Sequence, residues 1–106
     1  FGLLYLNDGV WNGERILPEG WVDFSVTPAP EKKGEGRGYA AQFWLMNHDD
    51  RLPSDTYTTA GSRGQFCTIV PSRQLIVVRM GIDPNAGSKW DRETFVAEVM
   101  ASLTEN

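Results

Sequence analysis

A short glycine-containing stretch in the second half of the chain has residue types that can bring backbone amides close to a ligand. It runs from Ala60 to Gln65 and reads AGSRGQ, just before a run of β-formers. Glycine lets the backbone bend sharply and approach another group closely, so amide N–H groups here could face a substrate. A simple β-bulge or turn is the more economical interpretation from composition alone, and both interpretations stay open at this point.

A second candidate for chemistry is His48-Asp49-Asp50, whose side chains can bind metals or transfer protons. Adjacent residues in a loop rarely converge on one ion, and His48 is the single histidine of the chain. A zinc site needs several His or Cys ligands. We therefore predict a solvated loop here, with no metal site, and the sequence implies no cofactor.

Two strands are predicted to hold the glycine-containing stretch in place. Gln65–Val70 is rich in β-formers, and Leu75–Val78 is an apolar run typical of a strand covered on both faces. Pro71–Gln74 between them has the proline and serine of a turn. Tyr39–Met46 is a further strand candidate, although its Ala-Ala-Gln sequence also suits a short helix.

The first part of the chain predicts two short helices joined by a turn. Leu3–Leu6 forms the first helix, and Gly9 suits a left-handed C-terminal cap. Asn12-Gly13 is typical of a small hairpin or loop. The second helix is predicted to start at Leu17 and to end before Pro28, because the residue preceding a proline is pushed out of the helical region.

The last helix is predicted to follow Ser88 or Asp91, either of which can cap it. Its apolar residues fall at helical spacing on one face, which we expect to pack on the sheet. The sequence thus predicts an α+β fold, with an antiparallel sheet of about three strands, flanking helices and the last helix on one side. The apolar residues of that helix are Phe95, Val96, Val99, Met100 and Leu103.

Length and composition limit the classes of function. At 106 residues the chain forms one domain at most, residues 1–106. Its formal net charge of −4 offers nothing to a nucleic-acid backbone. No stretch approaches the ~20 apolar residues of a membrane span, and no signal peptide is recognised. Cys67 is the single cysteine, so it forms no internal disulfide and leaves the redox compartment open.

Three blocks follow the pattern of a known family in the same order. They are the opening FGLLYLNDG with ILPEGWV at Ile16–Val22, the stretch AGSRGQF from Ala60, and VPSR at Val70–Arg73 followed by LIVVRMG. Together they resemble the C-terminal part of the serine β-lactamase and penicillin-binding-protein-like hydrolases. The nearest subset looks like the class C β-lactamase-related esterases and amide hydrolases, including the 6-aminohexanoate-dimer hydrolase type. The resemblance implies a strand over Tyr39–Met46.

The resemblance also implies a chemistry. Proteins of this family hydrolyse esters or amides through an acyl-enzyme, in which a Ser-x-x-Lys serine attacks and backbone amides hold the oxyanion. The chain contains no Ser-x-x-Lys, and the letters of the family's Tyr-x-Asn motif occur only at Tyr5, in the wrong block. The nucleophile and both proton-transfer residues are therefore expected upstream, and the chain alone is expected to be inactive.

The family's third motif, commonly Lys-Thr-Gly, is matched here by Thr59-Ala60-Gly61. In the family the next residue donates an oxyanion-hole amide, which carries over to the backbone N–H of Ser62. The basic residue of the motif is missing, although Arg63 could supply charge, and this departure favours a small ester or amide over a penicillin-type substrate. The rival interpretation makes Ser62 a nucleophile with His48 as its base. The implied substrate-binding residues are Thr59, Ala60, Gly61, Arg63 and Gly64.

The resemblance further implies that the chain is a partial domain, to which upstream residues add strands and an all-helical domain. One edge of the sheet and the faces of the first two helices would then be uncovered, so we expect self-association. The alternative function is a non-catalytic binding or interaction module of the same fold. The compartment stays unknown, with the periplasm favoured by the resemblance alone.

Overall fold

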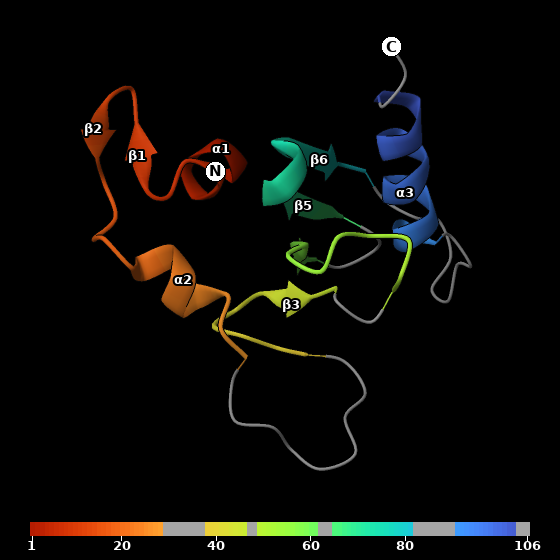
Figure 1. The fold of residues 1–106 in the computed structure, drawn as a ribbon, viewed down its shortest axis with the longest axis horizontal. Coiled ribbons are helices and arrows are strands. Elements are labelled where there is room, and N and C mark those ends of the chain that lie inside the picture. The colour runs from red at the N-terminus through yellow and green to blue at the C-terminus, as the bar shows by residue number, and fades with distance from the viewer. Residues whose placement is uncertain (29–37, 47–48, 62–64, 82–90, 104–106) are drawn as a thin grey trace.

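The computed structural model describes residues 1–28, 38–46, 49–61, 65–81 and 91–103. Figure 1 shows a sheet with the N-terminal helix on one side and the C-terminal helix on the other. The helices are α1 (Gly2–Leu6), α2 (Trp21–Ser25) and α3 (Arg92–Leu103), with a 3₁₀ turn, η2 (Pro71–Arg73). The strands are β1 (Val10–Trp11), β2 (Glu14–Arg15), β3 (Trp44–Leu45), β4 (Tyr57–Ala60), β5 (Phe66–Val70) and β6 (Leu75–Arg79).

The main sheet has four antiparallel strands in the order β3-β4-β5-β6, which confirms the α+β fold with an antiparallel sheet. The prediction of about three strands is wrong, because β4 is a further strand that pairs with β5 over its whole length. β4 lacks an apolar run, yet its central residue Thr58 is fully buried. The Thr58 hydroxyl lies 2.9 Å from the hydroxyl of Thr68 on β5, so a polar pair replaces the expected apolar contact.

The strand predicted over Tyr39–Met46 is much shorter in the structure. It consists of β3 and one isolated bridge at Tyr39. Between them Gln42 has a left-handed backbone with φ of 74°, and its N–H donates to the carbonyl of Ala40 at 2.9 Å. The Ala-Ala-Gln sequence therefore forms a tight turn, neither an extended strand nor a helix, and it limits β3 to two residues.

α3 covers one face of the sheet, as predicted. Val96 and Met100 are buried against this face, which confirms the apolar side of the helix at these two positions. The same prediction is wrong at the ends of the stripe, because Phe95 is 37% exposed and Leu103 is 63% exposed. The buried residues that meet in this half of the core are Met46, Leu52, Phe66, Val70, Val77, Val96 and Met100.

α1 covers the opposite face and is buried on the side that meets β5 and β6, while Leu3 on the same helix stays 49% exposed. Gly2 makes this contact possible, since a Cβ at that position would lie 2.8 Å from Cγ2 of Ile76 and 3.1 Å from Sγ of Cys67. The glycine lets the helix backbone approach β5 and β6 directly. The second half of the core lies here, with buried Ala40, Phe43, Leu45, Tyr57 and Ile69.

The predicted hairpin at Asn12-Gly13 is confirmed, because β1 and β2 pair antiparallel across it. Both turn residues have positive φ, 52° and 80°, as a tight hairpin turn requires. The second helix begins at Trp21, four residues later than the predicted Leu17, and its Trp21 and Phe24 side chains remain largely exposed. None of the helices in the described ranges has both the length and the apolar character needed to cross a membrane.

Candidate functional site

The structure places Thr59, Ala60 and Gly61 in a row at the C-terminal end of β4. Thr59 is half-buried, whereas Ala60 and Gly61 are exposed. The remaining residues of the predicted site, Ser62, Arg63 and Gly64, lie outside the described residues, as does His48, the base in the rival interpretation.

The amide of Gly61 is already used within the fold. Its N–H donates to the carbonyl of Gln65 at 2.7 Å, and this bond closes the connection between β4 and β5. An oxyanion hole requires N–H groups that are free to face the substrate. Gly61 therefore shapes the turn and does not itself donate to an oxyanion.

On the β3 side of Ala60 no described residue pairs with β4, and we call this stretch the open edge. Successive residues of an antiparallel strand direct their backbone N–H and C=O alternately to one neighbour and to the other. Gly61 bonds toward β5, so the backbone groups of Ala60 point to the β3 side. β3 pairs with β4 only as far as Thr58, and no described residue bonds the N–H or C=O of Ala60.

The rest of this end of β4 is fixed firmly onto β5. The N–H of Cys67 donates to Oγ1 of Thr59 at 3.0 Å, so the Thr59 side chain is occupied as an acceptor. The Thr58 hydroxyl lies 3.1 Å from the carbonyl oxygen of Cys67, in addition to its contact with Thr68. The edge at Ala60 is therefore held by a rigid ladder, which suits a surface that must keep its geometry.

The Cys67 thiol faces α1 and is not suited to nucleophilic chemistry. Burial raises its pKa, so the reactive thiolate is disfavoured. The Asp49 carboxylate receives three hydrogen bonds from Arg51, the shortest at 2.6 Å, instead of turning toward an ion. Within the parts of the chain that the structure describes, no group of three or more His, Cys, Asp or Glu side chains is placed to hold a metal ion.

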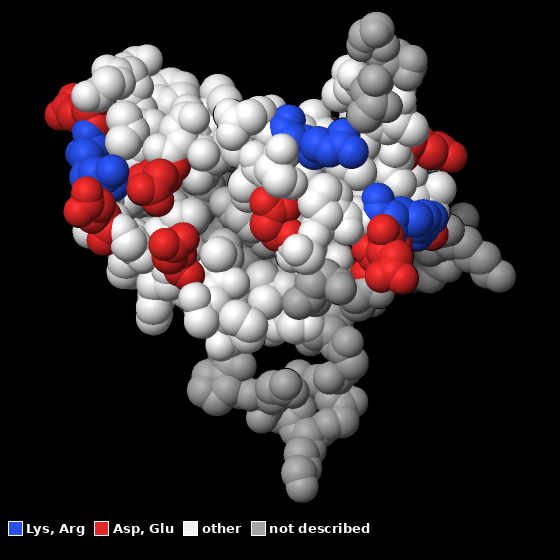
Figure 2. Space-filling view, viewed as in Figure 1, with Lys and Arg blue, Asp and Glu red and all other residues white. Residues whose placement is uncertain are grey.

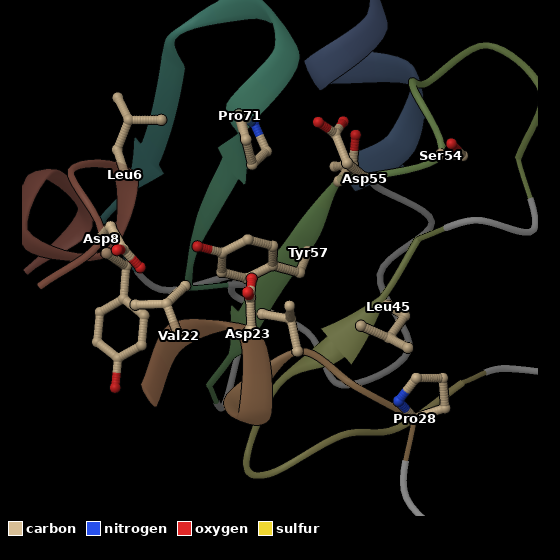
Figure 3. Close-up of a pocket in the computed structure, with 13 residues that line it drawn as sticks. Leu6, Asp8, Val22, Asp23, Pro28, Leu45, Ser54, Asp55, Tyr57 and Pro71 are labelled. Carbon is tan, nitrogen blue, oxygen red and sulfur yellow. The ribbon is translucent and has the colours of Figure 1, made fainter. Parts of the chain in front are cut away.

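A separate pocket lies at the other end of β4, on the side of the sheet that α1 covers. It has a volume of about 470 Å³ and lies between α1, α2, the start of β4 and Pro71 (Figure 3). Tyr57 forms part of its wall and is 2% exposed, and no group in the described part of the chain forms a hydrogen bond with its hydroxyl. Burial raises the pKa of Tyr57 well above its usual range, so the hydroxyl keeps its proton.

No strand is predicted over Tyr57–Ala60, so Tyr57 is not among the predicted site residues. The β-forming Tyr-Thr-Thr sequence could have predicted this strand. A strand here directs the Tyr57 ring to one face of the sheet.

No protein-family model matches the chain, and no curated protein matches it.

Proposed function

We propose that this chain is the C-terminal part of a serine hydrolase related to the class C β-lactamases, with an ester or a small amide as substrate. The observation that carries the proposal is the open edge of β4 at Ala60, directly before the Gly61 turn. This is the position that the resemblance assigns to a wall of the substrate cleft. The chain would supply that wall, and residues outside it would supply the nucleophile and its proton-transfer partners.

The open edge gives a physical means of holding an acyl substrate. An extended ligand can add to an exposed strand edge through main-chain hydrogen bonds. The N–H and C=O of Ala60 provide one donor and one acceptor for this purpose. Ester and amide substrates carry matching carbonyl oxygens, and amides also carry N–H donors. The resemblance assigns to the backbone N–H of Ser62 the role of holding the negative charge that develops on the reacting carbonyl oxygen.

The role of Ser62 can be tested by separating its backbone from its side chain. The assay is p-nitrophenyl butyrate hydrolysis by the longer gene product that contains this chain. Ser62→Pro removes the amide proton and is expected to lower kcat by about 10²–10³, the usual effect of losing one oxyanion donor. Ser62→Ala keeps the amide and is expected to retain activity within about threefold.

A second arm tests where the nucleophile lies. We expect this chain alone to be inert toward p-nitrophenyl butyrate, while the longer gene product is active and carries an upstream Ser-x-x-Lys. Turnover by the chain alone that Ser62→Ala abolishes would support the rival Ser62 nucleophile and contradict the proposal. Absence of activity from both proteins would favour the non-catalytic binding module.

We also propose that the chain associates with itself. α2 exposes two aromatic side chains whose ring centroids lie 5.6 Å apart, Trp21 at 43% and Phe24 at 61% exposure. In the described part of the chain no strand pairs with the outer edge of β6. Exposed apolar surface and a free strand edge both promote association. Analytical ultracentrifugation is expected to show dimers or larger species, and a clean monomer at tens of micromolar (on the order of assay concentrations) contradicts this.

A further inference from the structure

The pocket at the Tyr57 end of β4 combines an apolar interior with a polar rim. Leu6, Val22, Val26 and Leu45 supply aliphatic surface, and the rings of Tyr5 and Tyr57 add aromatic surface. A volume of about 470 Å³ is within the range of pockets that hold small organic molecules. The aliphatic part of a small ligand would find a suitable surface here.

The Tyr57 hydroxyl is an unused hydrogen-bond donor beside this pocket. In Figure 3 the Tyr57 ring lies across the pocket, with its hydroxyl end directed toward the side where Asp8 and Val22 lie. The oxygen is buried and has no partner among the described residues, although a buried polar group without one costs free energy. The neutral phenol carries an O–H donor, which a hydrogen-bond acceptor would satisfy.

The rim of the pocket is acidic. Asp8, Asp23 and Asp55 line it, and none of the described Lys or Arg side chains does. Asp55 accepts from the backbone N–H and the hydroxyl of Ser72 at 2.9 and 3.1 Å, and Asp8 lies 3.8 Å from Arg15. Among the described residues the Asp23 carboxylate has no hydrogen-bond or ion-pair partner. Figure 2 shows the same excess of acidic side chains over α1, the hairpin and α2.

We propose that this pocket binds a small organic ammonium ion that also carries a hydroxyl or carbonyl oxygen, such as an amino alcohol. The ammonium group lies at the rim beside Asp23, and its carbon chain lies along the aliphatic wall. The oxygen of the ligand accepts a hydrogen bond from the Tyr57 hydroxyl. This hydroxyl is shielded from solvent, so a side chain of the pocket wall has to move aside when the ligand binds. The pocket lies at the opposite end of β4 from Ala60, so this site stands independently of the proposed hydrolase.

Calorimetric titration of this chain tests the proposal with ligands that lack one group at a time. The probes are aminopropanol, aminobutanol and aminopentanol, each compared with the alkylamine and the diol of the same length. We expect at least one amino alcohol to bind about fivefold more tightly than both comparators, as one added hydrogen bond or one exposed charge pair allows.

Two variants test which protein group causes the tighter binding of the amino alcohol, one for its oxygen and one for its ammonium group. Tyr57→Phe is expected to remove the preference for the amino alcohol over the alkylamine, while binding of the alkylamine persists. Asp23→Asn is expected to remove the preference for the amino alcohol over the diol. Glu98→Gln on α3, on the opposite side of the sheet, is the matched control and is expected to change neither ratio.

Nuclear magnetic resonance locates the ligand, with amide shifts expected at Leu6, Val22 and Tyr57. Equal affinity for all three ligand types, or no binding by any amino alcohol, overturns the proposal and leaves an ordered water as the partner of Tyr57. Shifts confined to residues outside the pocket overturn it as well. A preference that survives Tyr57→Phe disproves the assigned hydrogen bond.

Discussion

The two ends of β4 lie in contrasting environments, although the strand has only four residues. At Tyr57 the strand is paired with β3 on one side and with β5 on the other. Residues of α1 pack on the same cluster, and the Tyr57 side chain is 2% exposed. At Ala60 the strand has β5 on one side, and on the other side no residue that the structure describes pairs with it. The difference arises because β3 ends opposite Thr58. A strand of four residues can therefore anchor the core at one end and offer backbone groups to a ligand at the other.

The largest expected effect is at the enclosed end. Tyr57→Ala removes a buried ring that lies edge-on to Phe43, with ring centroids 5.1 Å apart. It is expected to lower the free energy of unfolding by about 3–5 kcal/mol, as large-to-small changes in a core do. Urea unfolding followed by circular dichroism measures this value. Tyr57→Phe deletes an unpartnered hydroxyl and should be neutral or stabilising. A loss below about 1 kcal/mol for Tyr57→Ala shows that this end is not enclosed.

Proline substitution distinguishes the two sides of β4 directly. Thr59→Pro removes an N–H on the β5 side and is expected to cost about 2–3 kcal/mol, because a ladder bond is lost. Ala60→Pro removes an N–H on the open edge and is expected to change stability by about 1 kcal/mol or less, since edge strands tolerate proline. Thermal unfolding of the two variants gives the comparison. Equal losses would mean that the Ala60 amide has a partner in the fold.

The threonine pair between the two ends should contribute less. Thr58→Val leaves the buried hydroxyl of Thr68 without its partner at 2.9 Å and is expected to cost about 1–2 kcal/mol. The double variant with Thr68→Val should cost clearly less than the sum of the two single changes, because both partners are then apolar. A double-mutant cycle by urea unfolding measures the coupling. Strict additivity would show that the hydroxyls do not interact.

The smallest expected effect is far from both ends, at the start of α3. Asp91, one of the two predicted cap candidates, caps this helix, because Oδ1 accepts the Thr94 N–H at 3.2 Å and Oδ2 accepts its hydroxyl at 2.7 Å. The other candidate, Ser88, lies outside the described residues. These bonds hold the pKa of Asp91 below its usual value. The carboxylate therefore stabilises the fold above the unfolded pKa of about 3.9, and this contribution is lost as the pH falls through the lower folded value.

Asp91→Ala should accordingly cost about 0.5–1 kcal/mol at neutral pH, in the lower part of the range for helix caps. The difference between the variant and the original chain should shrink below about pH 4. Urea unfolding at both pH values checks this. If the difference in the free energy of unfolding between Asp91→Ala and the original chain does not change with pH, the effect comes from helix propensity alone.

The sequence predicts well where one residue type has one physical consequence. Asn12-Gly13 requires a tight turn, Asp91 caps a helix, and Val96 and Met100 fall on the buried side of α3. It fails where the outcome depends on distant partners. Thr58 is buried because Thr68 lies opposite it, a fact that no local pattern contains.

The candidate site, too, could be predicted from the sequence only in part. The position of Thr59-Ala60-Gly61 beside a turn follows from the glycine and the β-formers around it. That Ala60 lies on an open edge depends on where β3 ends, and β3 is shortened by the turn at Gln42. The unpartnered hydroxyl of Tyr57 likewise depends on how α1 and α2 close over it, which is a property of the packed molecule.

The close seating of Gly2 on Ile76 and Cys67 makes the thiol a reporter of helix docking. The thiol is half-buried beside Gly2, so undocking of α1 would expose it further. The rate of Cys67 alkylation should therefore rise when a substitution or a denaturant loosens the first helix, and the single cysteine reports on the local opening of this layer.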